Sequence, residues 1–254
     1  MKLEMRIDRF AALVLASCLA AFPGVSAADK KDKAKPEPIQ SVDSGSFGVF
    51  IKGQRVATET FKIEQQAGAS TIRSQVKANS GGDAASQKSE LAMTANGALL
   101  RYEWSQASGG SLSVSPSTDF LMERMTSGAN GKPAEQPFLM PSTTAILDNN
   151  FFVHREVLAW RYLGAACKPE GGVLKCQHGS ATFGAIVPQD HMSTNVRMEL
   201  VGKEKISVHG AERELLRLNL SGDNVEWALW VDDHDQFKLI RVAIPADDTE
   251  VVRD

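Results

Sequence analysis

The chain has 254 residues, of which 43% are hydrophobic and 23% charged, with 28 basic and 31 acidic residues. This slightly acidic balance excludes the basic field that binding to nucleic acid or to an anionic membrane requires. The length allows one large β domain or two small ones, with enough buried surface for a true core.

The first 27 residues predict a cleavable signal peptide. A basic start precedes an apolar run at 10–22, which is shorter than the roughly 20 residues that span a bilayer. Val25-Ser26-Ala27 is typical of a cleavage site. We therefore expect cleavage after Ala27, a periplasmic or secreted protein, and no transmembrane segment after the leader is removed. The basic residues of the start are Lys2, Arg6 and Arg9.

Leu15-Ala16-Ser17-Cys18 offers an alternative, because it resembles the lipobox of bacterial lipoproteins, in which Cys18 would carry a lipid anchor. The apolar run continues to Phe22, beyond the point at which a lipoprotein becomes polar, and this favours cleavage after Ala27. Removal of residues 1–27 leaves 25 basic and 29 acidic residues, a net charge of −4.

Residues 28–43 predict a disordered tether, because they are charged, contain proline and carry almost no large apolar side chains. Residues 44–254 predict a single β-rich domain. Apolar and polar residues alternate there with the period of half-buried strands, as at 71–78. Gly53-Gln54 and Asn96-Gly97 predict hairpin turns.

One segment departs from the alternation and predicts a helix of about 14 residues at about 148–163. Asp148 is a suitable N-cap and Gly164 would end the helix. Its apolar stripe would cover one side of the sheet. The stripe consists of Leu147, Phe151, Leu158 and Tyr162.

Strands return in the C-terminal third, at 214–221, 225–231 and 237–244, separated by short polar turns. Consecutive strands with such turns favour an antiparallel meander. The predicted fold is mainly β: a curved antiparallel sheet or half-barrel with one covering helix.

Cys167 and Cys176 flank a short segment with a Pro-Glu-Gly-Gly turn, so a hairpin would bring their Cβ atoms together. An oxidising compartment would join them in a structural disulfide. The alternatives are a redox pair or half of a metal site; His178 is the one nearby candidate for a further ligand.

The histidines show no metal-ligand spacing, and the sequence predicts no metal site and no cofactor. Asp190-His191 could supply a base with its orienting carboxylate, but no serine motif marks a nucleophile. The acidic segment at 232–235 is interpreted as a solvated turn. No catalytic residue is predicted.

Aromatic residues give the candidate ligand site. Trp104 and Trp227 lie on the apolar faces of their strands, whereas Trp230 points to the opposite face. Large apolar groups on both faces require cover on both, from the protein itself, a partner or a ligand. The candidate ligand-binding residues are Tyr102, Trp104, Phe151, Leu158, Trp227 and Trp230.

The stretch at 217–242, in which Trp-Val-Asp ends one strand and Lys-Leu-Ile-Arg-Val forms the next, resembles periplasmic lipoprotein carriers and their exported relatives. The resemblance implies a half-barrel that binds lipid without catalysis.

We therefore expect an exported, non-enzymatic protein that binds an apolar ligand, such as an acyl chain, on its concave face. The alternatives are an envelope module that binds a protein partner and has no cavity, and a hydrolase of unknown type.

Overall fold

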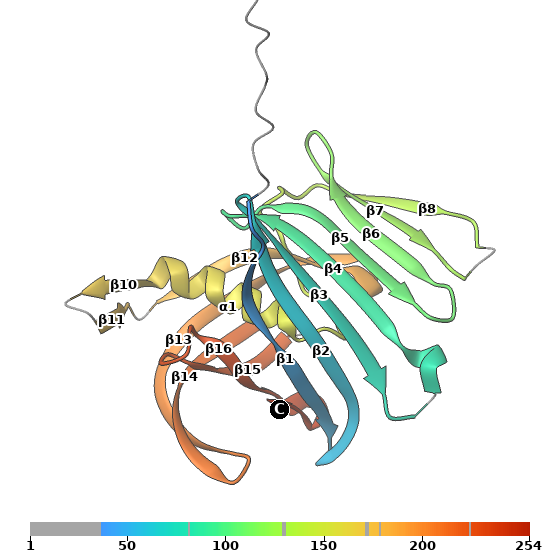
Figure 1. The fold of residues 1–254 in the computed structure, drawn as a ribbon. Helices are drawn as coiled ribbons and strands as arrows, with labels where there is room; N and C mark the ends of the chain where they lie inside the picture. Colours follow the sequence, from blue (N-terminus) through green and yellow to red (C-terminus); the bar gives the residue numbers. More distant parts are fainter. Residues whose placement is uncertain (1–36, 81, 129–130, 171–172, 178, 224) are drawn as a thin grey trace, which may run out of the picture. The chain divides into compact units, whose positions relative to one another are not determined.

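The alternating segments of the sequence become the strands of one curved, open sheet (Figure 1). The computed structural model describes residues 37–254 apart from 81, 129–130, 171–172, 178 and 224, so the predicted signal peptide and Cys18 lie outside the described residues. The large sheet has 15 strands, and one α-helix is present in the described part of the chain. The predicted half-barrel with one helix is confirmed.

The N-terminal half of the sheet is a meander in which each strand pairs with the next along the chain. The first strand begins at Gln40, four residues before the predicted start of the domain at 44. The strands are β1 (Gln40–Ile51), β2 (Gln54–Gln66), β3 (Ala69–Ala78), β4 (Gln87–Thr94), β5 (Leu99–Gln106), β6 (Ser111–Pro116), β7 (Leu121–Thr126) and β8 (Ala134–Phe138).

The C-terminal half forms the rest of the sheet, and its strands pair antiparallel except for the parallel pair of β9 with β12. A separate hairpin, β10 (Cys167–Glu170) with β11 (Val173–Cys176), follows the helix. The strands of the large sheet are β9 (Ala145–Ile146), β12 (Ser180–Val187), β13 (Met192–Val208), β14 (Ala211–Gly222), β15 (Val225–Asp232), β16 (Lys238–Ile244) and β17 (Thr249–Arg253).

The two halves join where β1 pairs with β17, with Phe47 opposite Arg253. This junction lies in the middle of the sheet, so the first and last strands of the domain are neighbours. The strands β8 and β9 remain at the two edges.

Tight turns set the register of the N-terminal meander. Asn96-Gly97 joins β4 to β5 as predicted, and Gly97 has a φ of 77°. The turn between β1 and β2 is Lys52-Gly53, one residue before the predicted Gly53-Gln54. Both of its residues have positive φ, 51° and 76°, as the right-handed twist of a hairpin favours.

The helix α1 (Val153–Ala166) has the predicted length of 14 residues but begins five residues later than predicted. Asp148 does not cap it, because the N-cap position is Phe152. The backbone N–H groups of Phe152 and Val153 instead donate to the Glu59 carboxylate on β2, at 2.6 and 3.3 Å. A cap from a residue 93 positions away leaves no local sequence signal.

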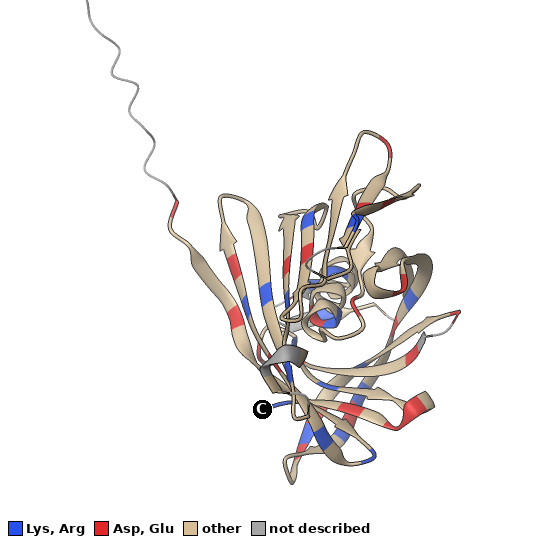
Figure 2. Cartoon of the chain, turned by 90° about the vertical axis from the view of Figure 1, so that its right-hand side faces the viewer, with Lys and Arg blue, Asp and Glu red and all other residues tan. Residues whose placement is uncertain are grey.

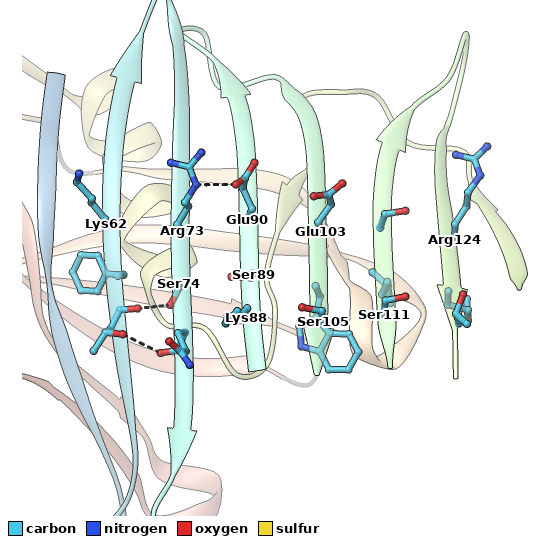
Figure 3. Close-up of a pocket in the computed structure, with 18 of the residues that line it drawn as sticks. Lys62, Arg73, Ser74, Lys88, Ser89, Glu90, Glu103, Ser105, Ser111 and Arg124 are labelled. Carbon is cyan, nitrogen blue, oxygen red and sulfur yellow. Dashed lines mark hydrogen bonds and ion pairs between the residues drawn. The ribbon is translucent and has the colours of Figure 1, made fainter. Parts of the chain in front are cut away.

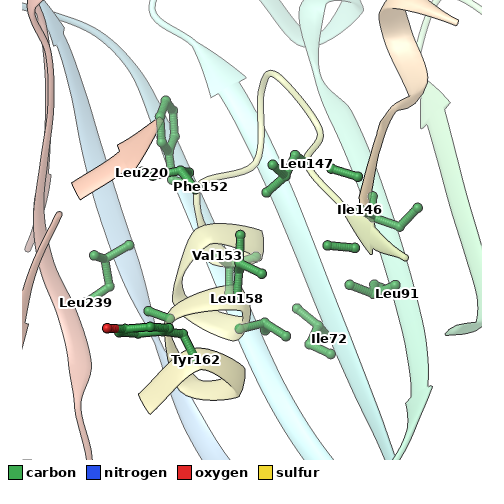
Figure 4. Close-up of a cluster of buried hydrophobic side chains, with 14 of the residues drawn as sticks. Ile72, Leu91, Ile146, Leu147, Phe152, Val153, Leu158, Tyr162, Leu220 and Leu239 are labelled. Carbon is green, nitrogen blue, oxygen red and sulfur yellow. The ribbon is translucent and has the colours of Figure 1, made fainter. Parts of the chain in front are cut away.

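The helix lies inside the curve of the sheet and does not merely cover one side of it (Figure 2). All residues from Val153 to Ala159 are buried, including three polar ones, His154, Arg155 and Glu156. Leucine, isoleucine and aromatic side chains of both halves of the sheet pack around it (Figure 4). The concave face under α1 is therefore filled by the side chains of the protein itself.

The β10–β11 hairpin places Cys167 opposite Cys176, with a Cα–Cα distance of 3.9 Å, and their sulfur atoms are bonded. The predicted disulfide thus closes the hairpin that follows α1.

We predict that native, unreduced protein has no alkylatable thiol at Cys167 or Cys176. Replacing both residues with Ser should lower the free energy of unfolding by about 2.5 to 3 kcal/mol, because a short loop is no longer closed in the unfolded chain. Urea denaturation measures this change. Labelling of either cysteine before reduction would contradict the pairing.

Candidate functional site

The structure separates the six predicted ligand-binding residues. Tyr102, Phe151 and Leu158 are fully buried in the core around α1. Trp227 packs against the same core, and the Arg155 guanidinium lies 4.4 Å above its ring. Only Trp104 among the six lines a groove described below.

Trp230 points away from this core, as predicted, and is only 6% exposed. It lies in a second apolar cluster on the other face of the sheet, and its indole N–H donates to Glu204 at 3.1 Å. The guanidinium groups of Arg217 and Arg241 lie over its ring, at 5.7 and 5.2 Å. Protein side chains therefore cover both faces of β15. The other members of the cluster are Ile206, Val208, Leu215 and Ile240.

One groove, of about 890 Å³, runs over the outer face of β2 to β7 (Figure 3). Its charged side chains form a chain of ion pairs across the strands. Glu64 binds Lys62 and Arg73, at 2.5 and 2.8 Å, and Glu90 binds Arg73 and Arg101, at 2.8 and 2.7 Å. The basic side chains are half exposed, so each pair contributes at most about 1 kcal/mol. The pairs account for the charges of Lys62, Arg73 and Glu90 in the lining without a ligand.

A second groove, of about 620 Å³, lies on the inner face, at the end of the sheet that α1 leaves uncovered. We call it the inner groove. The strands β4 to β8 form one wall, and the opposite wall comes from the loop before α1 and from the 3-10 turn Pro188–Asp190 with His191. The volume falls in the range of small-molecule sites, roughly 300 to 1,000 Å³. We call the N-terminal and C-terminal halves of the sheet its two arms; they meet at this groove.

Trp104 and Asn150 share one partner in the inner groove. The indole N–H of Trp104 and the side-chain amide of Asn150 both donate to Oε1 of Gln87, each at 3.0 Å. Three groove residues from β4, β5 and the loop before the helix are thereby fixed relative to one another. The half-buried Trp104 ring presents apolar surface beside Leu112 and Met125.

Gln189 is held from behind by Asp148, the residue predicted as a helix cap. Asp148 is fully buried and accepts hydrogen bonds from the Gln189 amide, the Tyr102 hydroxyl and the backbone N–H of Asn150. Burial raises the pKa of Asp148, although these hydrogen bonds oppose the rise. Tyr102, one of the predicted ligand residues, therefore acts on the groove through Asp148.

His191 lines the inner groove, and its Nδ1 lies 2.9 Å from a carboxylate oxygen of Glu123. The ring is 44% exposed, whereas the Glu123 side chain is 0% exposed. Burial raises the pKa of Glu123, against the hydrogen bond and charge of His191. The backbone carbonyl of His191 accepts a hydrogen bond from Gln136 on β8, at 2.9 Å, which links the two arms of the sheet.

The Asp190–His191 pair, which the hydrolase alternative would need, is not formed. Asp190 accepts a hydrogen bond from Asn149 at 3.0 Å, and the carboxylate beside His191 belongs to Glu123. Serine side chains line the inner groove, but within the described residues none of them is hydrogen-bonded to the imidazole. The structure therefore contains no preformed pair of nucleophile and base at this histidine.

Below the groove, Glu59 and Arg155 fix the helix that carries the Asn150 loop. Arg155 is fully buried and donates to the carbonyl of Phe151, at 2.9 Å, and to that of Asp148. Glu59 also accepts a hydrogen bond from Ser74 at 2.7 Å. Burial raises the pKa of Glu59 to about 7, although these donors and the charge of Arg155 oppose the rise.

Comparisons with protein-family models, with curated proteins and with solved structures find no match to this chain. In the described ranges, no helix has the length and apolar character needed to cross a bilayer. The same residues contain no group of three or more histidine, cysteine or acidic side chains placed to hold a metal ion. The site is therefore judged on its own geometry.

We predict that stability falls as the pH rises through 7, because the raised pKa of Glu59 means that the folded protein favours its neutral form. This contribution is complete below the ordinary value of 4.5 and amounts to roughly 3 kcal/mol. The loss falls mainly between pH 4.5 and pH 7, and over that range Glu59→Gln, which stays neutral, should lose less stability than the wild type.

Urea denaturation at each pH measures this difference. Because burial also raises the pKa of Glu156, to about 8, part of the slope should remain in the variant. Equal slopes in the two proteins would exclude Glu59 as the titrating group.

Proposed function

We propose that this chain is a non-enzymatic binding protein and that the inner groove holds its ligand, a small amphipathic molecule. The observation that carries the proposal is the support behind the groove: Gln87, Asp148 and Glu123 each fix side chains that line it. Side chains held in place before binding lose little entropy when a ligand arrives.

The two buried carboxylates favour a ligand site over a purely structural role. Burying an acid raises its pKa and costs stability, and an apolar residue at the same place would avoid that cost. Glu123 even leaves one oxygen, Oε1, without a hydrogen-bond partner in the described structure. The contact of Glu123 with His191 in the groove best explains why a carboxylate is kept there at this cost.

The sequence predicts an apolar ligand on the concave face, and the proposed site restricts both the position and the chemistry of that ligand. The space under α1 is occupied by core side chains, so a ligand has to use the uncovered part of the inner face. Its apolar part would lie on Trp104 and Met125, and its polar groups would meet the amides and His191. Binding of this kind is also what the resemblance to lipoprotein carriers implies.

We predict that Trp104→Ala abolishes ligand-dependent stabilisation in a thermal-shift screen of small amphiphiles. A ligand at 100 times its Kd stabilises the folded state by about 2.7 kcal/mol, which raises the melting temperature measurably. The matched control is Trp160→Ala, another half-buried tryptophan with a bonded indole N–H, which lies outside the groove. Equal ligand responses in both variants would contradict a site at Trp104.

We also propose that the protein works in the periplasm or outside the cell. The leader pattern at 1–27 and the disulfide support this, because disulfides persist in oxidising compartments.

N-terminal sequencing of the mature protein should give Ala28, and Cys18→Ala should fractionate with soluble proteins as the wild type does. A wild type bound to membranes, together with a released Cys18→Ala form, would show lipidation instead.

A further inference from the structure

Carboxamides are prominent among the polar side chains of the inner groove. There are four, Gln87, Gln106, Asn150 and Gln189, and they come from both walls. Each carboxamide carries an oxygen that accepts and an N–H₂ group that donates hydrogen bonds. A ligand complementary to them needs groups that also donate and accept at closely spaced positions. Hydroxyl groups have this property.

Hydroxyl side chains extend the same chemistry along the rim, from Ser108, Ser111 and Ser127. Gln106 is half-buried and makes no side-chain hydrogen bond to the described residues, so an acyl chain lying on it would remove its water without replacing the hydrogen bonds, at roughly 1 to 3 kcal/mol for each group left unpaired. The lining thus combines apolar surface from Trp104, Leu112 and Met125 with several groups that donate and accept hydrogen bonds.

Trp104 adds a flat apolar platform to this polar groove. The bond from its indole N–H to Gln87 sets the plane of the ring. A Cβ atom built on Gly110 would lie 3.4 Å from the edge of the ring, so this glycine borders the platform closely. A half-buried aromatic face held this way suits a ligand that is flat and apolar on one side and polar around its edge.

The charges of the groove set a further limit. Its lining includes Lys132 and His191, and none of the described side chains in the lining is acidic. Glu123 stands behind His191 and is occupied by it. The groove therefore suits neutral or acidic ligands and disfavours cationic ones.

We infer that the inner groove binds a saccharide, with the C–H face of one sugar ring on Trp104 and its hydroxyl groups on the carboxamides of both walls. The inference rests on the proposed function and names its ligand class. A sugar ring combines the two properties that the groove demands, an apolar face and a dense edge of groups that both donate and accept.

The test is an array of neutral, acidic and amino-sugar oligosaccharides, followed by titration calorimetry and saturation-transfer NMR on the full mature chain, with laurate as the lipid probe. We expect a saccharide to bind with saturation transfer to the protons of a single ring face. Trp104→Ala should weaken its binding by roughly tenfold or more, whereas Trp104→Phe, which keeps an aromatic face, should retain most of it.

Gln106→Leu separates the two ligand classes. The side chain of Gln106 makes no hydrogen bond to the described residues, so the substitution removes none from the protein itself. It should weaken saccharide binding and leave laurate binding unchanged or stronger, while Trp160→Ala should bind as the wild type does. Melting temperatures confirm that each variant is folded.

Laurate binding that depends on Trp104, with no saccharide bound, would overturn the inference and leave the proposed function standing. Saccharide binding that Trp104→Ala does not weaken would place the sugar elsewhere and also overturn it. If neither probe class binds, both the inference and the proposed function fail.

Discussion

The rest of this structure depends on the helix α1, whose first turns are buried on every side. Each ionisable side chain buried there needs a partner from the surrounding structure. Arg155 and Glu156 are adjacent and fully buried, and a buried ionisable or polar group without a partner destabilises a fold. Arg155 is stabilised by the carboxylate of Glu59 on β2 and donates a hydrogen bond to the carbonyl of Asp148. Arg253 on β17 lies 3.3 Å from Glu156. Strands from both ends of the chain must therefore converge on one helix, and the sheet has to curve around it.

The same constraint shapes the inner groove. Because α1 fills the centre of the half-barrel, the inner groove lies toward β4 to β8, beyond the reach of the helix. The loop that leads into the helix passes this surface and delivers Asp148 and Asn150 to it. The segment that anchors the helix thus also assembles the groove. The rigid core therefore holds the side chains of the groove in place.

The sequence was sufficient for the fold class because a period of two is a local signal that survives in almost every strand. The start of the helix was missed because its cap, Glu59, comes from a distant strand, and Asp148, a suitable local cap, serves the groove instead. Trp104 could be found as an aromatic residue at an inward strand position. Glu123 was equally visible as an acid at an inward position between Leu121 and Met125, where the alternation calls for an apolar residue, and such a violation of the pattern is typical of a functional position. The contacts of Gln87, Gln189 and His191 depend on the meeting of the two arms, which no local pattern encodes.

The central junction between β1 and β17 has a consequence for how the chain acquires its structure. The N-terminal meander is complete at Phe138, yet the edge of β1 that faces away from β2 has no neighbour until Thr249–Arg253 has been made. Until then an unpaired strand edge and the underside of Phe47 remain open, and Glu156 lacks the guanidinium of Arg253. Closure requires contacts about 200 residues apart in sequence, as between Asp43 and Arg253, and long loops close slowly. During synthesis from the N-terminus, β1 therefore keeps one unpaired edge until the five-residue strand β17 has been made, and the pairing of these two strands joins the halves of the sheet.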